Sequence, residues 1–285
     1  MPLYLLLVRS VPSLEFVAWR LVFTLPLCLA ILVFMSGGEE LREVLRDRRT
    51  MLTLLASSAT IGVNWFLYVF SIQSGFVYAA SLGYYILPLV MMLLGLVFLK
   101  ERLSRLQWGA VALAAIGVAA LATGALTTLW LSLSMGVTFG IYGLLRKTVK
   151  AGSLVGLTVE SMILTPVAIL ICCWYAFATP AGTAMGQGPV VAAAIAFSGP
   201  MTAVPLLMFA TAARRMPYTV IGFLQFTSPT IVFLLGLLVF GEDLKPAQLA
   251  CFVLIWAAAA LFIWELVRGN KPDAGDEVAS RGASA

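Results

Sequence analysis

Apolar segments of membrane-spanning length recur along the chain between Phe16 and Arg268, and short polar loops separate them. A helix needs about 20 mostly apolar residues to cross a bilayer. The pattern therefore predicts an all-α membrane protein with nine full spans. The predicted spans are Phe16–Met35, Met51–Ile72, Tyr78–Leu99, Leu106–Thr123, Leu129–Leu145, Leu154–Phe177, Pro189–Ala210, Thr219–Phe240 and Pro246–Val267.

The two ends of the chain do not fit this pattern. The apolar segment Met1–Val8 is far too short to cross a membrane and too short for a signal peptide. We expect it to be the end of a first helix that is truncated here, so that the intact fold would have ten helices. Residues 269–285 are polar and rich in small side chains, which predicts a disordered tail.

Composition excludes most soluble classes of protein. Hydrophobic residues make up 61% of the chain and charged residues 11%, whereas soluble domains carry about 25% charged residues. The net charge of +5 fits basic loops that face anionic lipid, so we expect a lipid bilayer and not nucleic acid as the partner. The chain has no histidine and its four cysteines lie in apolar segments, so we expect no metal and no cofactor.

The basic residues alternate between loops. Of the 18 Lys and Arg residues, only Arg9 and Lys245 fall in the alternate, charge-poor loops, and only Arg20 falls inside a span. Loops rich in Lys and Arg stay on the cytoplasmic side. The asymmetry predicts a plasma (inner) membrane protein whose C-terminus is cytoplasmic. The basic loops contain Arg42, Arg46, Arg48 and Arg49; Lys100, Arg102 and Arg105; Arg146, Lys147 and Lys150; Arg214 and Arg215; and Arg268, Lys271 and Arg281.

The two halves of the sequence resemble each other at a spacing of 140–141 residues. Pro88 and Glu101 match Pro229 and Glu242, and the same order of proline, L-L-G-L and glutamate occurs in both halves. We predict two five-helix repeats, over residues 1–124 and 125–268. Because five is odd, the second repeat must be inverted in the membrane, an architecture typical of secondary transporters.

Several motifs together resemble one known family. They are Asn64-Trp65, Ser81-Leu82-Gly83-Tyr84-Tyr85 with Pro88-Leu89, Tyr142-Gly143-Leu144-Leu145-Arg146-Lys147, Val204-Pro205-Leu206-Leu207, and Gly222 with Gln225 and Pro229-Thr230. In this order they resemble the RarD branch of the EamA-type drug/metabolite transporters, over essentially the whole chain. The resemblance implies ten helices in two inverted repeats and the export or exchange of small organic solutes, with chloramphenicol-like drugs among the candidates.

Two charged residues lie well inside predicted spans, at equivalent positions of the two repeats. They are Arg20 and Glu160. Intramembrane charges are costly and usually face a cavity or a partner. We expect Arg20 to attract an anionic group of the substrate and Glu160 to carry a proton or hold a cationic group. The inverted arrangement places them at different depths, too far apart to pair. The alternative is that backbone carbonyls hold them or that they snorkel to the interface.

Further candidate cavity residues are polar or aromatic side chains at span depth: Asn64, Trp65, Tyr84, Tyr85 and Gln225. A small-molecule site combines apolar walls with a few placed polar groups. For Asn64 and Gln225 the alternative is a hydrogen bond between helices, and for the aromatic residues it is an interfacial belt.

Two prolines, Pro88 and Pro229, occupy equivalent positions inside predicted spans. Proline removes a backbone hydrogen bond and kinks a helix. We expect paired helix bends beside the substrate path. The alternative is that proline is simply frequent in membrane helices.

These observations favour a secondary transporter over an enzyme. No nucleophile–base motif, no metal-binding motif and no P-loop occurs in the sequence, so the prediction is not an enzyme. The closest alternative is a channel or facilitator without coupling, which would need a pore lined by polar rings or carbonyls. A purely structural membrane protein fits the paired charges less well. The predicted partner is a small-molecule substrate, and a homodimer is compatible with the pattern.

Overall fold

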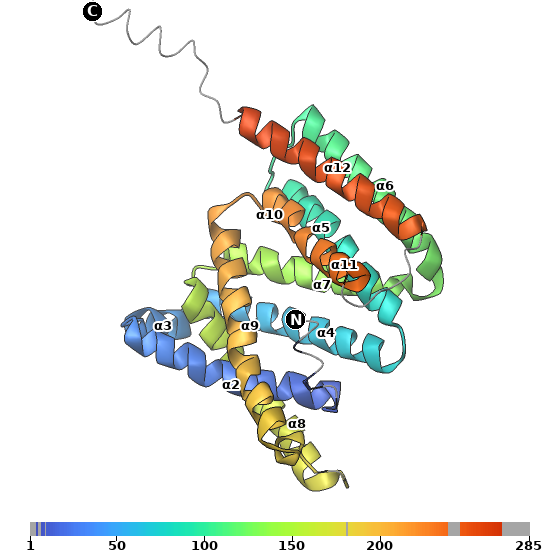
Figure 1. Ribbon diagram of the computed structural model, residues 1–285. Helices are drawn as coiled ribbons and strands as arrows, with labels where there is room; N and C mark the ends of the chain where they lie inside the picture. The colour runs from blue at the N-terminus through green and yellow to red at the C-terminus, as the bar shows by residue number, and fades with distance from the viewer. Residues whose placement is uncertain (1–3, 5–6, 9, 181, 239–245, 270–285) are drawn as a thin grey trace, which may run out of the picture. The chain divides into compact units, whose positions relative to one another are not determined.

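The described part of the chain is helical throughout. In a computed structural model, residues 4, 7–8, 10–180, 182–238 and 246–269 are described, and they contain helices and turns but no strand (Figure 1). The α-helices are α2 (Ser13–Phe34), α3 (Gly38–Arg46), α4 (Arg48–Gln73), α5 (Val77–Phe98), α6 (Arg105–Ala122), α7 (Leu129–Thr148), α8 (Ser153–Ala178), α9 (Pro189–Arg215), α10 (Tyr218–Gln225), α11 (Thr227–Leu238) and α12 (Pro246–Gly269). Two short 3-10 helices are η1 (Thr123–Thr128) and η2 (Ala184–Gly186).

Eight helices in this part of the chain are long and apolar enough to cross a membrane. They correspond to eight of the nine predicted spans, and the predicted all-α membrane fold is confirmed. Large apolar side chains such as Phe34, Leu170 and Phe177 are exposed, as expected where lipid replaces water. The predicted first-helix remnant Met1–Val8 and the predicted tail lie largely outside the described residues.

The predicted span Thr219–Phe240 is not one helix in the described residues. α10 ends at Gln225, and α11 begins at Thr227. Pro229 contributes to the break, because in a continuous helix its ring would clash with the carbonyl of the residue four positions earlier, which is Gln225. In the first turn of α11 the missing N–H of Pro229 costs nothing, because the first N–H groups of a helix have no partner within it.

Two helix starts show how local sequence sets the boundaries. Asp47 precedes α4, and its carboxylate accepts hydrogen bonds from the backbone N–H groups of Arg49 and Thr50 and from the Thr50 hydroxyl. The hydroxyl bond and the Arg49 N–H bond lower the pKa of Asp47. Ser104 and Gln107 form a reciprocal capping box at the start of α6.

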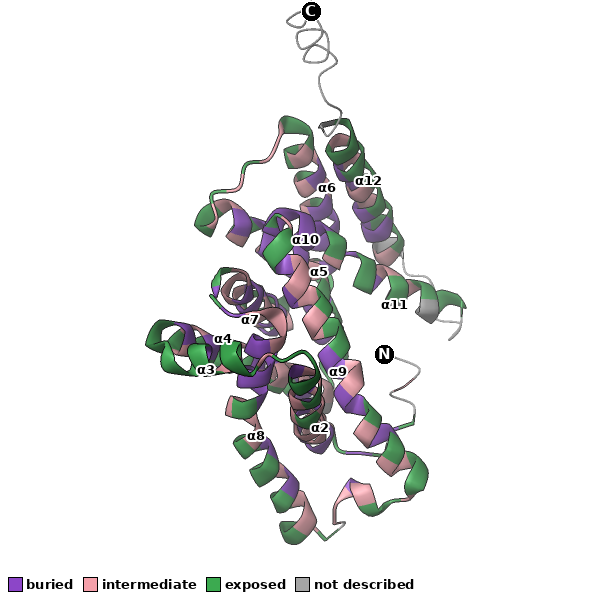
Figure 2. Cartoon of the chain, turned by 90° about the vertical axis from the view of Figure 1, so that its left-hand side faces the viewer, coloured by how far each residue is buried: buried purple, intermediate pink, exposed green. Residues whose placement is uncertain are grey.

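The helices form two compact units, and each unit contains helices from both halves of the sequence. One unit contains α2 to α5 together with α7 to α11. The other contains α6 and α12, which lie side by side (Figure 1). Within the larger unit, Figure 2 shows buried residues concentrated where α5, α7 and α10 meet. There Leu87, Met91, Tyr218 and Ile221 form part of one apolar cluster.

The helix boundaries repeat along the chain. α2 and α8 begin 140 residues apart, at Ser13 and Ser153, and the pairs α4 and α9, α5 and α10, and α6 and α12 each begin 141 residues apart. This spacing is the one at which the sequence motifs recur.

Three pairs of equivalent helices, α5 with α10, α6 with α12 and α2 with α8, pack against each other in antiparallel orientation. In α5 and α10, Gly95 contacts Thr219 and Gly222 contacts Pro88, so residue numbers rise along one helix as they fall along the other. The same holds within the smaller unit. Gly117 of α6 meets Cys251 of α12, whereas Gly109, earlier in α6, faces Leu261, later in α12. α2 and α8 follow the same rule, because their clusters join Ala18 with Cys172 and Cys28 with Leu157.

Antiparallel packing of equivalent helices is what an inverted repeat produces. A twofold axis in the membrane plane turns each helix upside down, whereas an axis along the membrane normal would leave equivalent helices parallel. The larger unit thus has the geometry of an inverted-repeat transporter fold.

Candidate functional site

A narrow cavity lies inside the larger unit, between α2, α4, α7, α8 and α9. Its volume is about 10 Å³, close to the space that one water molecule needs. The walls are mostly apolar and carry a few polar groups, the composition of a small-molecule site. The lining residues are Leu21, Thr24, Ile61, Trp65, Tyr142, Leu157, Glu160, Ser161, Leu164, Thr202 and Leu206.

Glu160 forms one wall of this cavity and is held by three side chains. Its Oε1 accepts a hydrogen bond of 2.5 Å from the Ser57 hydroxyl and lies 3.7 Å from Arg146 Nε. Its Oε2 accepts a longer bond of 3.5 Å from the Tyr142 hydroxyl. Glu160 is only 2% exposed and Arg146 is fully buried. The carboxylate predicted to line the cavity is therefore neutralised by a cation that the sequence assigned to a loop.

Arg146 belongs to the last turn of α7 and not to the basic loop after it. Its Nη2 donates a 2.8 Å hydrogen bond to the backbone carbonyl of Ser153, the first residue of α8. Its Nε and Nη1 make no hydrogen bond within the described residues. The guanidinium lies directly over Gly156, where an added Cβ would overlap Nη1. A glycine slot on α8 thus receives the arginine from α7.

Arg20, the second predicted charge, stands apart from this pair. Its guanidinium carbon lies 5.2 Å from the centroid of the Trp65 ring, a cation–π contact. The phenols of Tyr68 and Tyr84 are within electrostatic range. Arg20 Nε is buried without a hydrogen-bond partner in the described part of the chain. Trp65 joins the two regions, since it also lines the cavity beside Glu160.

Asn64 makes the interhelical contact that was the alternative to a cavity role. Its Nδ2 donates to the backbone carbonyl of Met135 at 2.8 Å and to Thr138 Oγ1 at 3.0 Å, both on α7. Asn64 is 8% exposed and is not among the lining residues. In this conformation it joins α4 to α7.

The remaining predicted site residues lie on α5 and at the α10–α11 junction, outside the lining of this cavity. Tyr84 is 44% exposed, and its ring meets that of Tyr68 edge-on at 6.3 Å. Tyr85 is half-buried on α5, and half-buried Gln225 ends α10. Pro88 lies inside an unbroken α5, whereas its equivalent Pro229 follows the break between α10 and α11.

The end of the bundle at which α7 ends and α8 begins is closed by further polar contacts. We call it the α7–α8 loop end. Lys147 Nζ donates to the carbonyls of Ala213 and Met216 at 2.9 and 2.6 Å, at the end of α9. Arg214 Nη1 donates to the carbonyl of Ala151 in the α7–α8 loop.

A carboxylate holds the start of α10 near the same end. Glu101 Oε1 accepts from the Tyr218 N–H at 2.6 Å, and Oε2 accepts from the Thr219 N–H at 2.8 Å. An acidic group is favourable at a helix N-terminus because of the exposed N–H groups and the helix dipole. Lys147 and Arg214, which the sequence analysis places in basic loops, thus hold helix ends together here.

The sequence reasoning missed Arg146, Tyr142 and Ser57 as partners of Glu160. Arg146 was counted as a loop charge because it stands next to Lys147. A usable signal was present, because Tyr142 and Arg146 are four residues apart and therefore share one face of α7. Their opposing glycine, Gly156, could be identified only from the packing of α8.

Comparison with known proteins gives one consistent result. A family model described as the EamA-like transporter family matches residues 2–123. A protein of Pseudomonas aeruginosa named as an uncharacterized transporter is 39% identical over 267 residues, covering 94% of this chain and 89% of its own. Protein RarD of Streptomyces exfoliatus is 38% identical over 94% of this chain and 84% of its own.

A solved crystal structure shares the fold. It superposes with a TM-score of 0.70 at 16% sequence identity, covering 92% of this chain and 91% of that one. The helical architecture and the relatives agree: this chain is a RarD-type member of the EamA-like transporter family and a multi-pass membrane protein.

Proposed function

We propose that this protein is an inner-membrane secondary transporter that exports or exchanges a small organic solute by alternating access. The observation that carries the proposal is the cavity, which helices of both halves enclose and on which a buried carboxylate lies. Secondary transporters place their sites between inverted repeats and expose them alternately to the two sides. The narrowness of the cavity fits a carrier between open states better than a continuous pore.

Glu160 on the cavity wall, and Arg20 beside the lining residue Trp65, suggest what is carried. Arg20 has no acidic partner among the described residues, so it is suited to an anionic or strongly polar group of the solute. Trp65 offers an apolar face beside it. Glu160 is the carboxylate on the cavity wall, and we propose that it carries the coupling proton. Chloramphenicol-like compounds are a reasonable first probe.

The loop charges give the proposed orientation. With the basic loops inside, the C-terminus and the α7–α8 loop end are cytoplasmic. The cavity in this conformation would then be closed toward the cytoplasm by the contacts at that end.

Flux in proteoliposomes tests the proposal. The purified protein is reconstituted, and uptake of radiolabelled chloramphenicol is measured with and without unlabelled compound inside and with an imposed pH gradient. A saturable uptake that internal compound stimulates, and that Glu160→Gln abolishes, supports the carrier. Glu43→Gln is the matched control, because Glu43 is exposed on the short helix α3.

Because the natural solute is open, the same variants are compared in an export screen. Cells producing the wild type, Glu160→Gln or Glu43→Gln are grown alike, and the metabolites in the medium are measured. A compound released by wild type and Glu43→Gln but not by Glu160→Gln identifies a substrate. Equal release by all three, together with unsaturable flux in the liposomes, would contradict the proposal.

A further inference from the structure

Arg146 is placed in an energetically unfavourable position. It is fully buried, and two of its three guanidinium nitrogens have no hydrogen-bond partner in the described residues. Burying an ion pair costs more desolvation free energy than the attraction usually returns, and apolar residues of similar volume often give a more stable protein. Stability alone therefore does not explain why α7 turns this arginine inward.

The position of Arg146 relative to the cavity suggests a different reason. Tyr142 and Glu160 line the cavity, and Arg146 comes one turn after Tyr142 on α7, about 6 Å further toward the loop. Its guanidinium spans from Glu160 to the Ser153 carbonyl, and so joins α7 to the first turn of α8. The arginine thus occupies the space between the cavity and the α7–α8 loop end.

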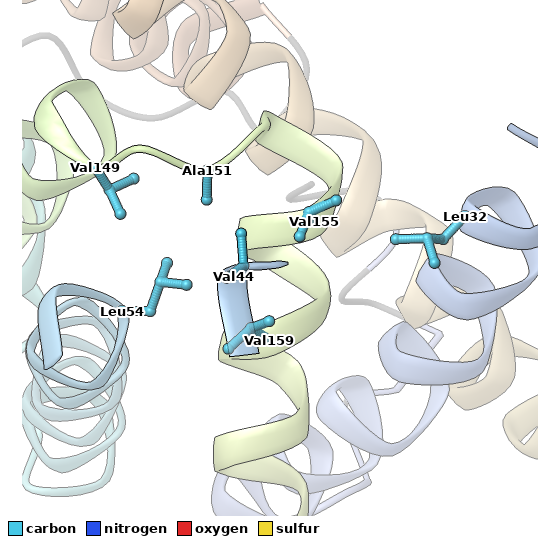
Figure 3. Packing of buried hydrophobic residues seen from close by; sticks show 7 residues of the cluster. All are labelled: Leu32, Val44, Leu54, Val149, Ala151, Val155 and Val159. Carbon is cyan, nitrogen blue, oxygen red and sulfur yellow. The ribbon is translucent and has the colours of Figure 1, made fainter. Parts of the chain in front are cut away.

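Beyond Arg146 the path is filled by apolar side chains. Figure 3 shows Val149 and Ala151 on the α7–α8 loop and Val155 and Val159 on α8, facing Leu54 of α4. These residues form one buried cluster with Leu32 and Val44. Toward this end, Arg146 is therefore the charged residue between the mostly apolar cavity and a buried apolar cluster.

We propose that Arg146 is the gate residue at the α7–α8 loop end of the cavity. While the Arg146 guanidinium contacts Glu160 and lies over Gly156, it closes the cavity on this side. Opening requires the guanidinium to leave both residues. The inference rests on the proposed function, in that the cavity is the solute path. It adds to that function the residue that closes the cavity, the side on which the cavity closes and the contacts that close it.

Gly156 gives the gate a property that can be tested without changing any charge. A Cβ at this position would overlap Arg146 Nη1, so the guanidinium cannot stay where it is in Gly156→Ala. Gly62 is the matched control, because a Cβ there would meet only the Leu164 side chain, at an ordinary distance of 3.5 Å. Both changes add one methyl group to a membrane helix at positions facing the bundle.

The experiment measures access to the cavity and needs no known solute. All four cysteines are first replaced, and Ser161, on the cavity wall, is changed to Cys. Lys150→Cys, in the exposed part of the α7–α8 loop, shows in a parallel sample which face of the membrane this loop occupies. A membrane-impermeant thiol reagent is added to right-side-out or inside-out vesicles, and the rate of labelling of Ser161→Cys is measured from each side.

We expect slow labelling from the loop side in the parent and in Gly62→Ala, and faster labelling in Gly156→Ala. A rise of about tenfold or more is expected, the change produced when the closed–open equilibrium shifts by about 1.4 kcal/mol. Labelling from the opposite side should stay the same or fall. Arg146→Ala combined with Glu160→Gln, which leaves no buried charge unpaired, should open the same side.

Two results would overturn the gate. The proposal is overturned if the rate of labelling from the loop side is unchanged both in Gly156→Ala and in the double variant Arg146→Ala/Glu160→Gln. An equal rise from both sides also overturns it, because it indicates general loosening. If Gly156→Ala is not inserted in the membrane, the double variant decides alone. The transport proposal fails separately, if the parent protein shows no saturable flux of any probe.

Discussion

Replacing Arg146 by Met or Glu160 by Leu, singly and together, tests whether the two charges form a desolvated pair. The single change Glu160→Leu leaves a fully buried guanidinium with one hydrogen bond, to the Ser153 carbonyl. Removing one partner of a buried pair costs about 3–5 kcal/mol. Arg146→Met leaves a carboxylate that is 2% exposed and has two hydroxyl donors, Ser57 and Tyr142, so it should fall at the lower end of that range.

The double variant should be much milder than either single one. Replacing the whole pair by apolar residues is neutral or stabilising by about 1–4 kcal/mol in other proteins. Against that gain, the Ser57 hydroxyl loses its 2.5 Å acceptor, which costs about 1–3 kcal/mol if the group stays unpaired. A serine in a helix can turn to the carbonyl four residues earlier and recover part of this cost. We therefore expect the double variant within about 2 kcal/mol of wild type.

The free energy of unfolding is measured in mixed micelles by titration with SDS, followed by tryptophan fluorescence. Glu43→Leu, on the exposed side of α3, is the control and should change stability by less than about 0.5 kcal/mol. The decisive quantity is the coupling energy of the double-mutant cycle, expected to be about 3 kcal/mol or more. If each single variant costs less than about 1 kcal/mol and the effects add, the two charges are not a buried pair.

Three other changes test contacts that the structure adds to the sequence. Asn64→Ala removes two hydrogen bonds to α7 and should cost about 1 kcal/mol; an equal loss in Asn64→Leu would show that the amide and not its volume matters. Glu101→Gln weakens the cap on α10 and should cost about 1–2 kcal/mol in unfolding free energy, while Arg105→Gln, on the exposed start of α6, should cost nothing measurable. The pKa of Asp47 is lowered because the Thr50 hydroxyl and backbone N–H groups favour the charged carboxylate. The stabilisation that this carboxylate gives to α4 is therefore fully present above the ordinary Asp pKa of 3.8. It is lost as the pH falls through the lower pKa of the folded state. The difference in melting temperature between wild type and Asp47→Asn should therefore shrink at acid pH, and a difference that does not change with pH would refute this assignment.

The sequence predicted the fold well because membrane helices leave strong local signals. Length and apolarity alone located eight of the spans, since a lipid environment requires every backbone group to be paired inside its own segment. In the described residues, the predicted span Thr219–Phe240 is interrupted at Phe226, close to Pro229. Its equivalent, Pro88, stands inside a continuous α5, so proline alone did not determine where a helix breaks.

The site was only partly predictable, because the partners of a buried charge come from other helices. Glu160 and Trp65 line the narrow cavity, and their contact with a substrate stays a prediction. Asn64 instead joins α4 to α7 through hydrogen bonds. Neither the helical periodicity nor the composition of the sequence shows whether an amide side chain lines a cavity or bonds to another helix. Counting the charges in the loops could not predict that Arg146 is buried, because a basic residue in the last turn of a helix can point either into the bundle or toward the membrane interface.

The two halves differ in chemistry at equivalent positions of α2 and α8, although they are related in sequence. At the spacing of 140, the residue equivalent to Gly156 is Phe16. Phe16 is buried in an apolar cluster with Ala184 and Ile195, and neighbouring Glu15 accepts hydrogen bonds from the hydroxyl of Thr183 and the N–H of Ala184. The first half therefore has no glycine slot for an arginine at that place. In the described part of the chain, the ion pair of Arg146 with Glu160 lies toward the α7–α8 loop end, so a change that weakens charge pairing is expected to act at that end.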